Sequence, residues 1–135
     1  MREEVRALAL HRLTRARDAF AEGEQLLGTN ALTGATNRFY YAAFHAARAL
    51  LATREVDSSK HSGVISLFQR HFVRTGVVAM GPAQALPRAF EKRQKTDYGD
   101  FSAIAPEEVT QIRAEVQAFV NECARVLDRL ATEEA

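Results

Sequence analysis

The stretch from Asn37 to Leu51, NRFYYAAFHAARALL, constrains the fold more than any other part of the chain. It contains neither glycine nor proline, and it is apolar on almost every side of a helical projection. A helix that is apolar all round is usually buried among other helices, and the repeated alanines allow neighbouring backbones to approach closely. We therefore predict a central helix over about residues 31–53, packed among other helices.

One stripe of this predicted helix is cationic and aromatic rather than apolar. Its members lie at spacings of three, four and three residues, and they are Arg38, Tyr41, His45 and Arg48. Residues at these spacings share one face of a helix. Because unpaired buried charge is costly, we expect this stripe to face a ligand, a partner chain or acidic groups.

The remaining helices follow from apolar spacing and from helix-ending residues. They are predicted at residues 3–27, 59–74, 82–95 and 106–130, with residues 96–105 as a loop. No segment shows the period-two alternation that is typical of strands. The sequence thus predicts an all-α, up-and-down bundle of about five helices, forming a single domain over residues 1–135.

Composition excludes several classes of protein. The 18 basic and 17 acidic residues give a net charge of +1, which argues against a strongly basic coat for nucleic acid. No apolar run is long enough for a membrane span, and the amino end lacks a signal-peptide core. The single Cys123 fits a cytoplasmic protein without internal disulfides. The four histidines form no pair with metal-ligand spacing, so we expect no metal and no cofactor.

A second polar constellation lies near residue 95. Arg93 occupies a position where the helical spacing predicts an apolar residue, and Asp97 and Tyr98 follow it. Arginine suits bidentate binding of phosphate or carboxylate, and a tyrosine can donate a hydroxyl or stack on a base. The alternative interpretation is a structural ion pair. For the arginines of the first helix, we expect a solvated face, with an RNA-facing patch as the alternative.

Three runs of the chain closely resemble the small prokaryotic HEPN-domain proteins (higher eukaryotes and prokaryotes nucleotide-binding). They are RFYYAAFHAARALL, KHSGVISLFQRHFVRTG and FEKRQKTDYGDF. The resemblance implies a helical bundle that is often a homodimer and is often encoded beside a minimal nucleotidyltransferase, as toxin and antitoxin. It also implies that many active members are metal-independent ribonucleases. Those use an arginine, four to six intervening residues and a histidine at the dimer interface.

The chain departs from this pattern at the histidine. Arg93 matches the arginine of the motif, but Tyr98 stands where the histidine is expected. A phenol with an unperturbed pKa of about 10 is a poor general base at neutral pH. The same formal pattern recurs as Arg38 and His45, on a different helix. Candidate catalytic residues are therefore Arg93, Asp97, Tyr98 and His45, and candidate nucleotide- or RNA-binding residues are Arg38, Tyr41, Arg48 and Arg93.

Three functional hypotheses remain open at this point. The chain is a dimeric module that binds nucleotide, RNA or a partner nucleotidyltransferase in a toxin–antitoxin-like system, or it is a metal-independent ribonuclease toxin. The third hypothesis is a structural bundle without a ligand. The first two require that the guanidinium of Arg93 and the stripe of the central helix meet on one accessible surface.

Overall fold

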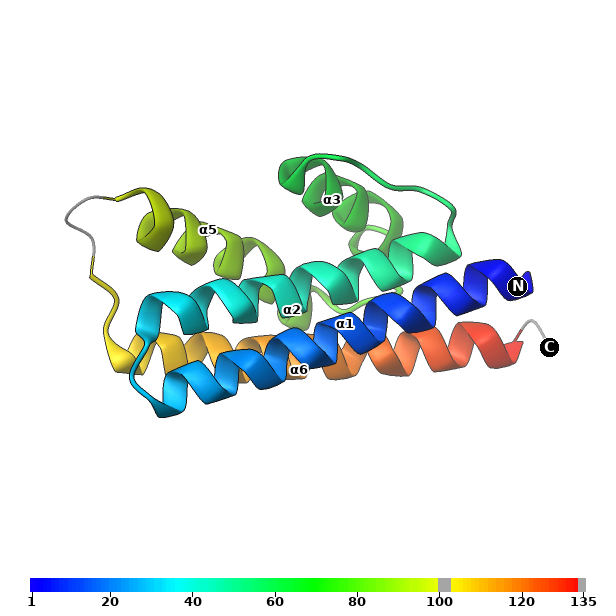
Figure 1. Ribbon diagram of the computed structural model, residues 1–135. Coiled ribbons are helices and arrows are strands. Elements are labelled where there is room, and N and C mark those ends of the chain that lie inside the picture. Colours follow the sequence, from blue (N-terminus) through cyan, green and yellow to red (C-terminus); the bar gives the residue numbers. More distant parts are fainter. Residues whose placement is uncertain (100–102, 134–135) are drawn as a thin grey trace.

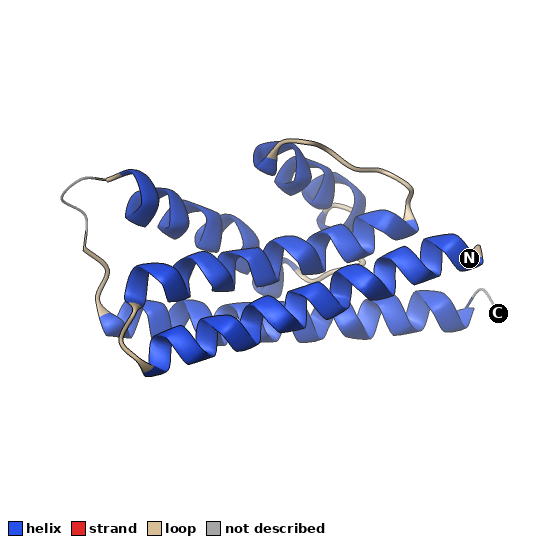
Figure 2. Ribbon diagram, viewed as in Figure 1, coloured by secondary structure: helices blue, strands red, loops and turns tan. Residues whose placement is uncertain are grey.

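A computed structural model describes residues 1–99 and 103–133 of the chain, except for the side chain of Tyr98. Its α-helices are α1 (Glu3–Gly28), α2 (Leu32–Thr53), α3 (His61–Phe68), α4 (Met80–Ala83), α5 (Ala85–Tyr98) and α6 (Pro106–Glu133). A π-helical segment, η1 (Gln69–Val73), continues α3. Neither described range contains a strand, as Figure 2 shows, and the predicted all-α class is confirmed.

The three longest helices, α1, α2 and α6, run side by side along the molecule (Figure 1). The chain runs in one direction along α1 and returns along α2, and α6 runs parallel to α2. The shorter α3 and α5 pack against α2, and α5 also contacts α6. In the described ranges, no helix combines the length and the hydrophobicity that a membrane crossing requires.

The central position of α2 follows from its sequence. It contacts α1, α3, α5 and α6, and its large side chains Phe39, Leu50 and Leu51 are completely buried. Its alanines let the neighbouring helices come close. On the opposing surface of α1, a Cβ atom added to Gly23 would lie 2.7 Å from the ring of Phe39. The ring of Phe39 therefore packs directly against the backbone of α1, at a position that only glycine fits without rearrangement.

The chain between α2 and α6 differs in detail from the prediction. The third helix begins at His61 rather than near residue 59, and it widens into η1 before ending near Gly76, whose φ is +77°. The helix predicted at 82–95 is divided at Gln84 into α4 and α5. Pro87 lies in the first turn of α5, where its missing N–H costs no helical hydrogen bond.

The carboxyl end of α5 also lies further along the chain than predicted. It reaches Tyr98, so residues 96–98, predicted as loop, are helical. Arg93 and Asp97 are consequently one helical turn apart on α5 and form an ion pair, with 3.1 Å between Nε and Oδ2. The longer helix therefore orients the side chain of Arg93, because it places the carboxylate partner one turn away on the same helix.

Candidate nucleic-acid interface

The structure brings Arg93 of α5 and the polar stripe of α2 together on one surface. The Cζ atom of Arg93 lies 5.4 Å from the ring centroid of Tyr41 and 5.3 Å from that of Tyr40. The Cζ atom of Arg38 lies 5.1 Å from the Tyr41 centroid. A guanidinium at this distance is attracted to the face of an aromatic ring. Tyr41 thus links two arginines from two different helices.

These two arginines are only partly engaged by acidic partners. The Nε atom of Arg38 lies 3.8 Å from a carboxylate oxygen of Glu22, and its side chain is 34% exposed. The Nε atoms of Arg38 and Arg93 are both buried and make no hydrogen bond with the described residues, despite the ion pair of Arg93 with Asp97. A ligand cannot reach these buried Nε atoms, but the Nη atoms of both arginines also make no hydrogen bond with the described residues and remain as donors for a further anion.

Asp97 has a positioning role in this arrangement. Besides its ion pair with Arg93, it accepts a hydrogen bond from the side-chain amide of Asn37 on α2, over 3.4 Å. These contacts tie the end of α5 to the start of α2. The carboxylate that the sequence suggested as a catalytic group is thus engaged in holding the two helices and Arg93 in place.

An aromatic cluster, defined as Tyr40, Tyr41, Phe44, His61 and Phe90, surrounds these arginines. The His61 ring stacks on Phe44 with 4.7 Å between centroids. Its Nδ1 lies 2.5 Å from the hydroxyl oxygen of Tyr40, which fixes the ring orientation. Burial raises the pKa of Tyr40, and burial together with the charge of Arg93 lowers the pKa of His61.

A basic cluster lies further along α2, defined as Arg12, Arg15, His45, Arg48 and Asp57. Asp57 accepts hydrogen bonds from Nη2 of Arg48 over 2.8 Å and from Nη2 of Arg12 over 3.2 Å. Arg12 also donates to the backbone carbonyl of Arg48 over 3.1 Å. The hydrogen bond from Arg48 is the main reason that the pKa of Asp57 is lowered. One carboxylate therefore holds arginines from α1 and α2.

His45 lies at the centre of the basic cluster as a buried, neutral imidazole. The residue is only 6% exposed, and its Nδ1 is buried without a hydrogen-bond partner among the described residues. Burial, as the largest cause, and the positive charges of four arginines together lower the pKa of His45 to about 4. In order of effect, these arginines are Arg15, Arg48, Arg38 and Arg12. His45 is therefore neutral at neutral pH, because burial and the nearby arginines both disfavour its protonated form.

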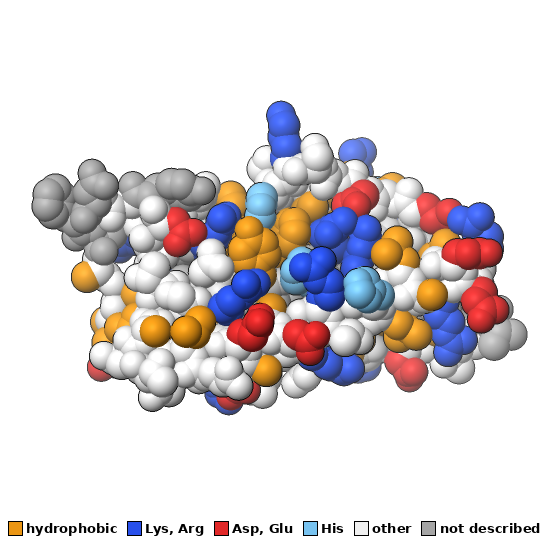
Figure 3. Space-filling model, viewed as in Figure 1, with side chains coloured by type: hydrophobic (Ala, Val, Ile, Leu, Met, Phe, Trp, Pro, Cys, Tyr) orange, Lys and Arg blue, Asp and Glu red, His pale blue; other side chains and the backbone are white. Residues whose placement is uncertain are grey.

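Figure 3 shows the two clusters on one face of the molecule. Lysine or arginine and histidine side chains gather in the middle of this face around hydrophobic side chains, with acidic side chains at the margin. Within the described residues, Arg15 makes no ion pair or side-chain hydrogen bond. The face can therefore attract an extended anion without first breaking all of its own ion pairs.

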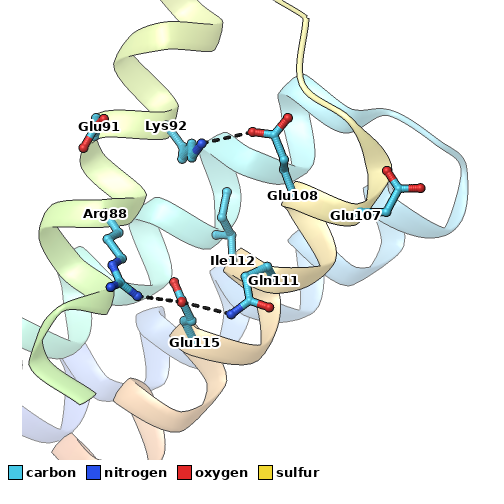
Figure 4. A pocket seen from close by; sticks show the side chains of 8 residues that line it. All are labelled: Arg88, Glu91, Lys92, Glu107, Glu108, Gln111, Ile112 and Glu115. Atoms are coloured by element: carbon cyan, nitrogen blue, oxygen red, sulfur yellow. Dashed lines mark hydrogen bonds and ion pairs between the residues drawn. The ribbon is translucent and has the colours of Figure 1, made fainter. Parts of the chain in front are cut away.

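A cavity lies elsewhere, between α5 and α6, with a volume of about 490 Å³. We call it the acidic pocket, and Figure 4 shows the residues that line it. Its two cations are already paired across the helices, Lys92 with Glu108 over 3.0 Å and Arg88 with Glu115 over 2.9 Å. Glu91 and Glu107 also line it, so the pocket carries an excess of negative charge. It does not suit a phosphate.

The sequence-predicted residues fall into both clusters. Tyr41 belongs to the aromatic cluster, and Arg38 and Arg93 lie against its ring. His45 and Arg48 belong to the basic cluster. The side chain of Tyr98 lies outside the described residues. Within residues 1–99 and 103–133, no group of three or more histidine, cysteine or acidic side chains is arranged to hold a metal ion.

Sequence reasoning missed several members of this surface. Arg12 and Arg15 were interpreted as part of a solvated face, although their spacing of three places them on one side of α1. His61 was placed on a helix face but not in a site. Its position beside Phe44 and Tyr40 depends on how α3 packs across α2, and no local pattern signals that packing.

Comparison with known proteins identifies the family. Residues 9–127 match the HEPN domain. A Thermotoga maritima protein named UPF0332 protein is 34% identical over 116 residues, covering 86% of this chain and 88% of that protein. A Methanocaldococcus jannaschii protein that bears the name Putative toxin MJ0605 is 30% identical over 130 residues, covering 96% of this chain and 93% of that protein. This chain therefore belongs to the HEPN domain family.

Proposed function

We propose that this chain is a toxin-like HEPN module that binds RNA, as a homodimer, through the surface formed by the aromatic and basic clusters. The single observation that carries the proposal is the meeting of Arg38 and Arg93 over Tyr41. Phosphate groups supply most of the affinity in nucleic-acid complexes, and unpaired bases stack on aromatic side chains or on arginine planes. The surface offers both kinds of contact.

The shape of the surface favours a chain-like ligand over a small enclosed one. The cavities of the described residues are lined by other residues than Arg38, Tyr41, His45 and Arg93. Small-molecule sites are usually concave and bury most of their ligand. Arg38 and His45 are seven positions apart, which is about 10 Å along a helix. The two clusters can therefore contact different nucleotides of one strand.

Electrostatics favours binding over catalysis at His45. An effective general acid or base has a pKa near the working pH, whereas the pKa of His45 is lowered to about 4. At neutral pH His45 is therefore not an imidazolium and cannot act as a general acid through that form. The imidazole is instead a neutral group within a field of arginines, and this is consistent with a surface that attracts phosphate.

The test is binding of a fluorescently labelled single-stranded RNA, followed by anisotropy, with an RNA duplex of the same sequence as competitor. We expect saturable binding of the single strand that weakens with salt and is only poorly reversed by the duplex. A surface built for stacking requires unpaired bases. Absence of binding to any RNA at low ionic strength would refute the proposal.

A metal-independent ribonuclease is the second candidate, and the orientation of His61 favours it. This imidazole is partly exposed, is held at Nδ1 by Tyr40, and lies on the same surface as Arg93. Incubation of RNA with the protein in excess chelator tests this candidate. Cleavage that is lost in both His61→Gln and Arg93→Gln supports the ribonuclease, and intact RNA in the presence of binding supports the module.

The proposed homodimer and the proposed nucleotidyltransferase partner are tested separately. The name of the Methanocaldococcus jannaschii relative refers to a toxin, and toxins of this kind are proposed here to work with an antitoxin. Sedimentation analysis at micromolar concentration gives the mass of the free chain, and a monomer would contradict the homodimer. Co-expression with a minimal nucleotidyltransferase encoded next to this chain should give a stable complex that masks RNA binding.

A further inference from the structure

The basic cluster differs from the rest of the proposed RNA surface in its charge balance. Near Tyr41, Arg38 and Arg93 each have one carboxylate within 4 Å, Glu22 and Asp97 respectively. In the basic cluster, Arg12, Arg15 and Arg48 share a single carboxylate, Asp57, in the described structure. Two positive charges therefore remain uncompensated beside His45.

The carboxylates at the carboxyl end of α2 are already paired. Asp57 has a side chain that is 42% exposed and pairs with Arg48 and Arg12. Glu55, two residues earlier, is 60% exposed and pairs with Arg2. A phosphodiester backbone that followed α2 from Tyr41 would pass the basic cluster and then meet the pair of Glu55 and Arg2. This pair has no net charge to attract a further phosphate.

We propose that the basic cluster is a subsite for a terminal phosphate monoester, where the path of the bound RNA ends. The inference rests on the proposed RNA binding and names the chemistry of the end that is bound. A phosphate monoester carries close to two negative charges above about pH 6, whereas each internal phosphodiester carries one. The uncompensated charge beside His45 matches the monoester.

Arg15 and His45 have distinct roles in this subsite. Arg15 makes no ion pair or hydrogen bond with the described residues, so its guanidinium is available for a bidentate contact with phosphate oxygens. Arg15 lies three positions after Arg12 on the same side of α1, and Arg12 donates to Asp57 and to the backbone carbonyl of Arg48, so this side of α1 faces the cluster. His45 fills the buried floor of the cluster without adding positive charge, and its 6% exposure leaves the arginines to make the contacts.

The test compares one RNA sequence with three different ends: a 5′-phosphate, a 3′-phosphate, or hydroxyl groups at both ends. Anisotropy at about pH 7.5 keeps the phosphate monoester as the dianion. We expect the wild-type chain to bind one phosphorylated form about tenfold or more tightly than the unphosphorylated RNA, which is the usual size of a charge-assisted contact. Arg15→Gln should reduce this preference to about threefold or less.

Arg17→Gln is the matched control, because Arg17 is an exposed arginine on the same helix and lines a different hollow with Leu10 and Arg125. It should keep the full preference for the phosphorylated end. Equal affinity of the wild-type chain for all three RNA forms would overturn the subsite while leaving RNA binding intact. Loss of the preference in Arg17→Gln as well as in Arg15→Gln would also overturn it.

Titration with adenosine monophosphate and with adenosine separates the subsite from the proposed function. If no RNA binds but the monophosphate binds through Arg15 and adenosine does not, the subsite stands and RNA as its ligand is refuted. If neither RNA nor the monophosphate binds, both the subsite and the RNA proposal fall. A phosphate-dependent preference that Arg15→Gln abolishes in RNA and in the mononucleotide assigns the same contact to both ligands.

Discussion

The basic cluster and the acidic pocket are both built from charged side chains between packed helices, yet they differ in how many of their cations have a carboxylate partner of their own. In the acidic pocket, Arg88 and Lys92 of α5 each face a carboxylate of α6 across a gap of about one hydrogen bond. In the basic cluster, Arg12 and Arg48 have to share Asp57, and Arg15 has no ion pair among the described residues.

The comparison shows that a well-formed cavity is not necessarily the region with the most polar groups available to a ligand. The acidic pocket has a volume of about 490 Å³, but its cations are already paired and gain little from a new ligand. On the surface over α2, guanidinium nitrogens of Arg38 and Arg93 and the buried Nδ1 of His45 make no hydrogen bond with the described residues. Unsatisfied polar groups are costly to maintain, so their concentration on one face indicates a binding surface.

Acid titration should give the largest effect, and it should come mainly from His45 of the basic cluster. The pKa of His45 is about 4 in the folded chain and about 6.5 when unfolded. Because the unfolded state binds more protons between these values, the free energy of unfolding should fall as pH drops from about 6.5 to 4, by up to about 3 kcal/mol. Urea unfolding at several pH values measures this fall.

His45→Gln should flatten that pH dependence, because the side-chain amide has no proton to gain in this range. His61, whose pKa is also lowered, contributes in the same direction, and His61→Gln separates its share. His11→Gln, at an exposed residue of α1, is the control and should leave the curve unchanged. A wild-type curve that His45→Gln does not alter would contradict the buried neutral imidazole.

The second prediction compares two arginines of α5. Arg93→Gln should weaken RNA binding by about 10- to 100-fold, since charge-assisted hydrogen bonds contribute about 1.5–3 kcal/mol. Arg88→Gln, five positions earlier on the same helix, removes the same charge from the acidic pocket and should leave affinity unchanged within about twofold. Equal losses in both variants would mean that only net charge matters, and the proposed surface would be wrong.

Because Arg93 also pairs with Asp97, its replacement can lower stability, and Arg38→Gln provides a check. Arg38 is 34% exposed and its nearest carboxylate is 3.8 Å away, so its loss should affect the fold less. It should nevertheless weaken RNA binding by about tenfold, on the same physical grounds. Normal affinity in a folded Arg38→Gln variant would argue against the meeting of the two arginines as the binding site.

Salt dependence offers a third, smaller test of the same contrast. For single strands, the logarithm of the binding constant falls with the logarithm of salt concentration by about 0.7 for each phosphate that is neutralised. Arg93→Gln should therefore reduce the slope by about 0.7, and Arg88→Gln should not change it. A slope near zero for the wild-type chain would show that phosphate contacts do not contribute to binding.

The smallest effect is expected within the acidic pocket. Glu115→Gln removes the charge that pairs with Arg88, whose side chain is 61% exposed. Exposed ion pairs contribute about 0–1 kcal/mol, so urea unfolding should shift by no more than this. A loss of several kcal/mol would show that the pocket is a structural centre of the molecule, and the contrast between the two regions would then need revision.

Local sequence patterns were sufficient to predict the helices and the part of the candidate surface that α2 contributes. The alanine-rich, apolar segment around Phe39 and Leu50 can only be satisfied by burial on all sides, and α2 is indeed the central helix. The stripe of Arg38, Tyr41 and His45 followed from helical periodicity alone. These features depend on residues close together in the chain, and the 3.6-residue period determines their geometry.

Only the tertiary structure decided which residues from other helices complete that surface. Arg12 reaches Asp57 and the backbone carbonyl of Arg48 because α1 packs along α2. His61 reaches Phe44 because α3 packs against α2, and α5 extends past residue 95 so that Asp97 holds Arg93. These contacts join residues far apart in the chain. They depend on the packing of whole helices, so no local spacing of residues encodes them.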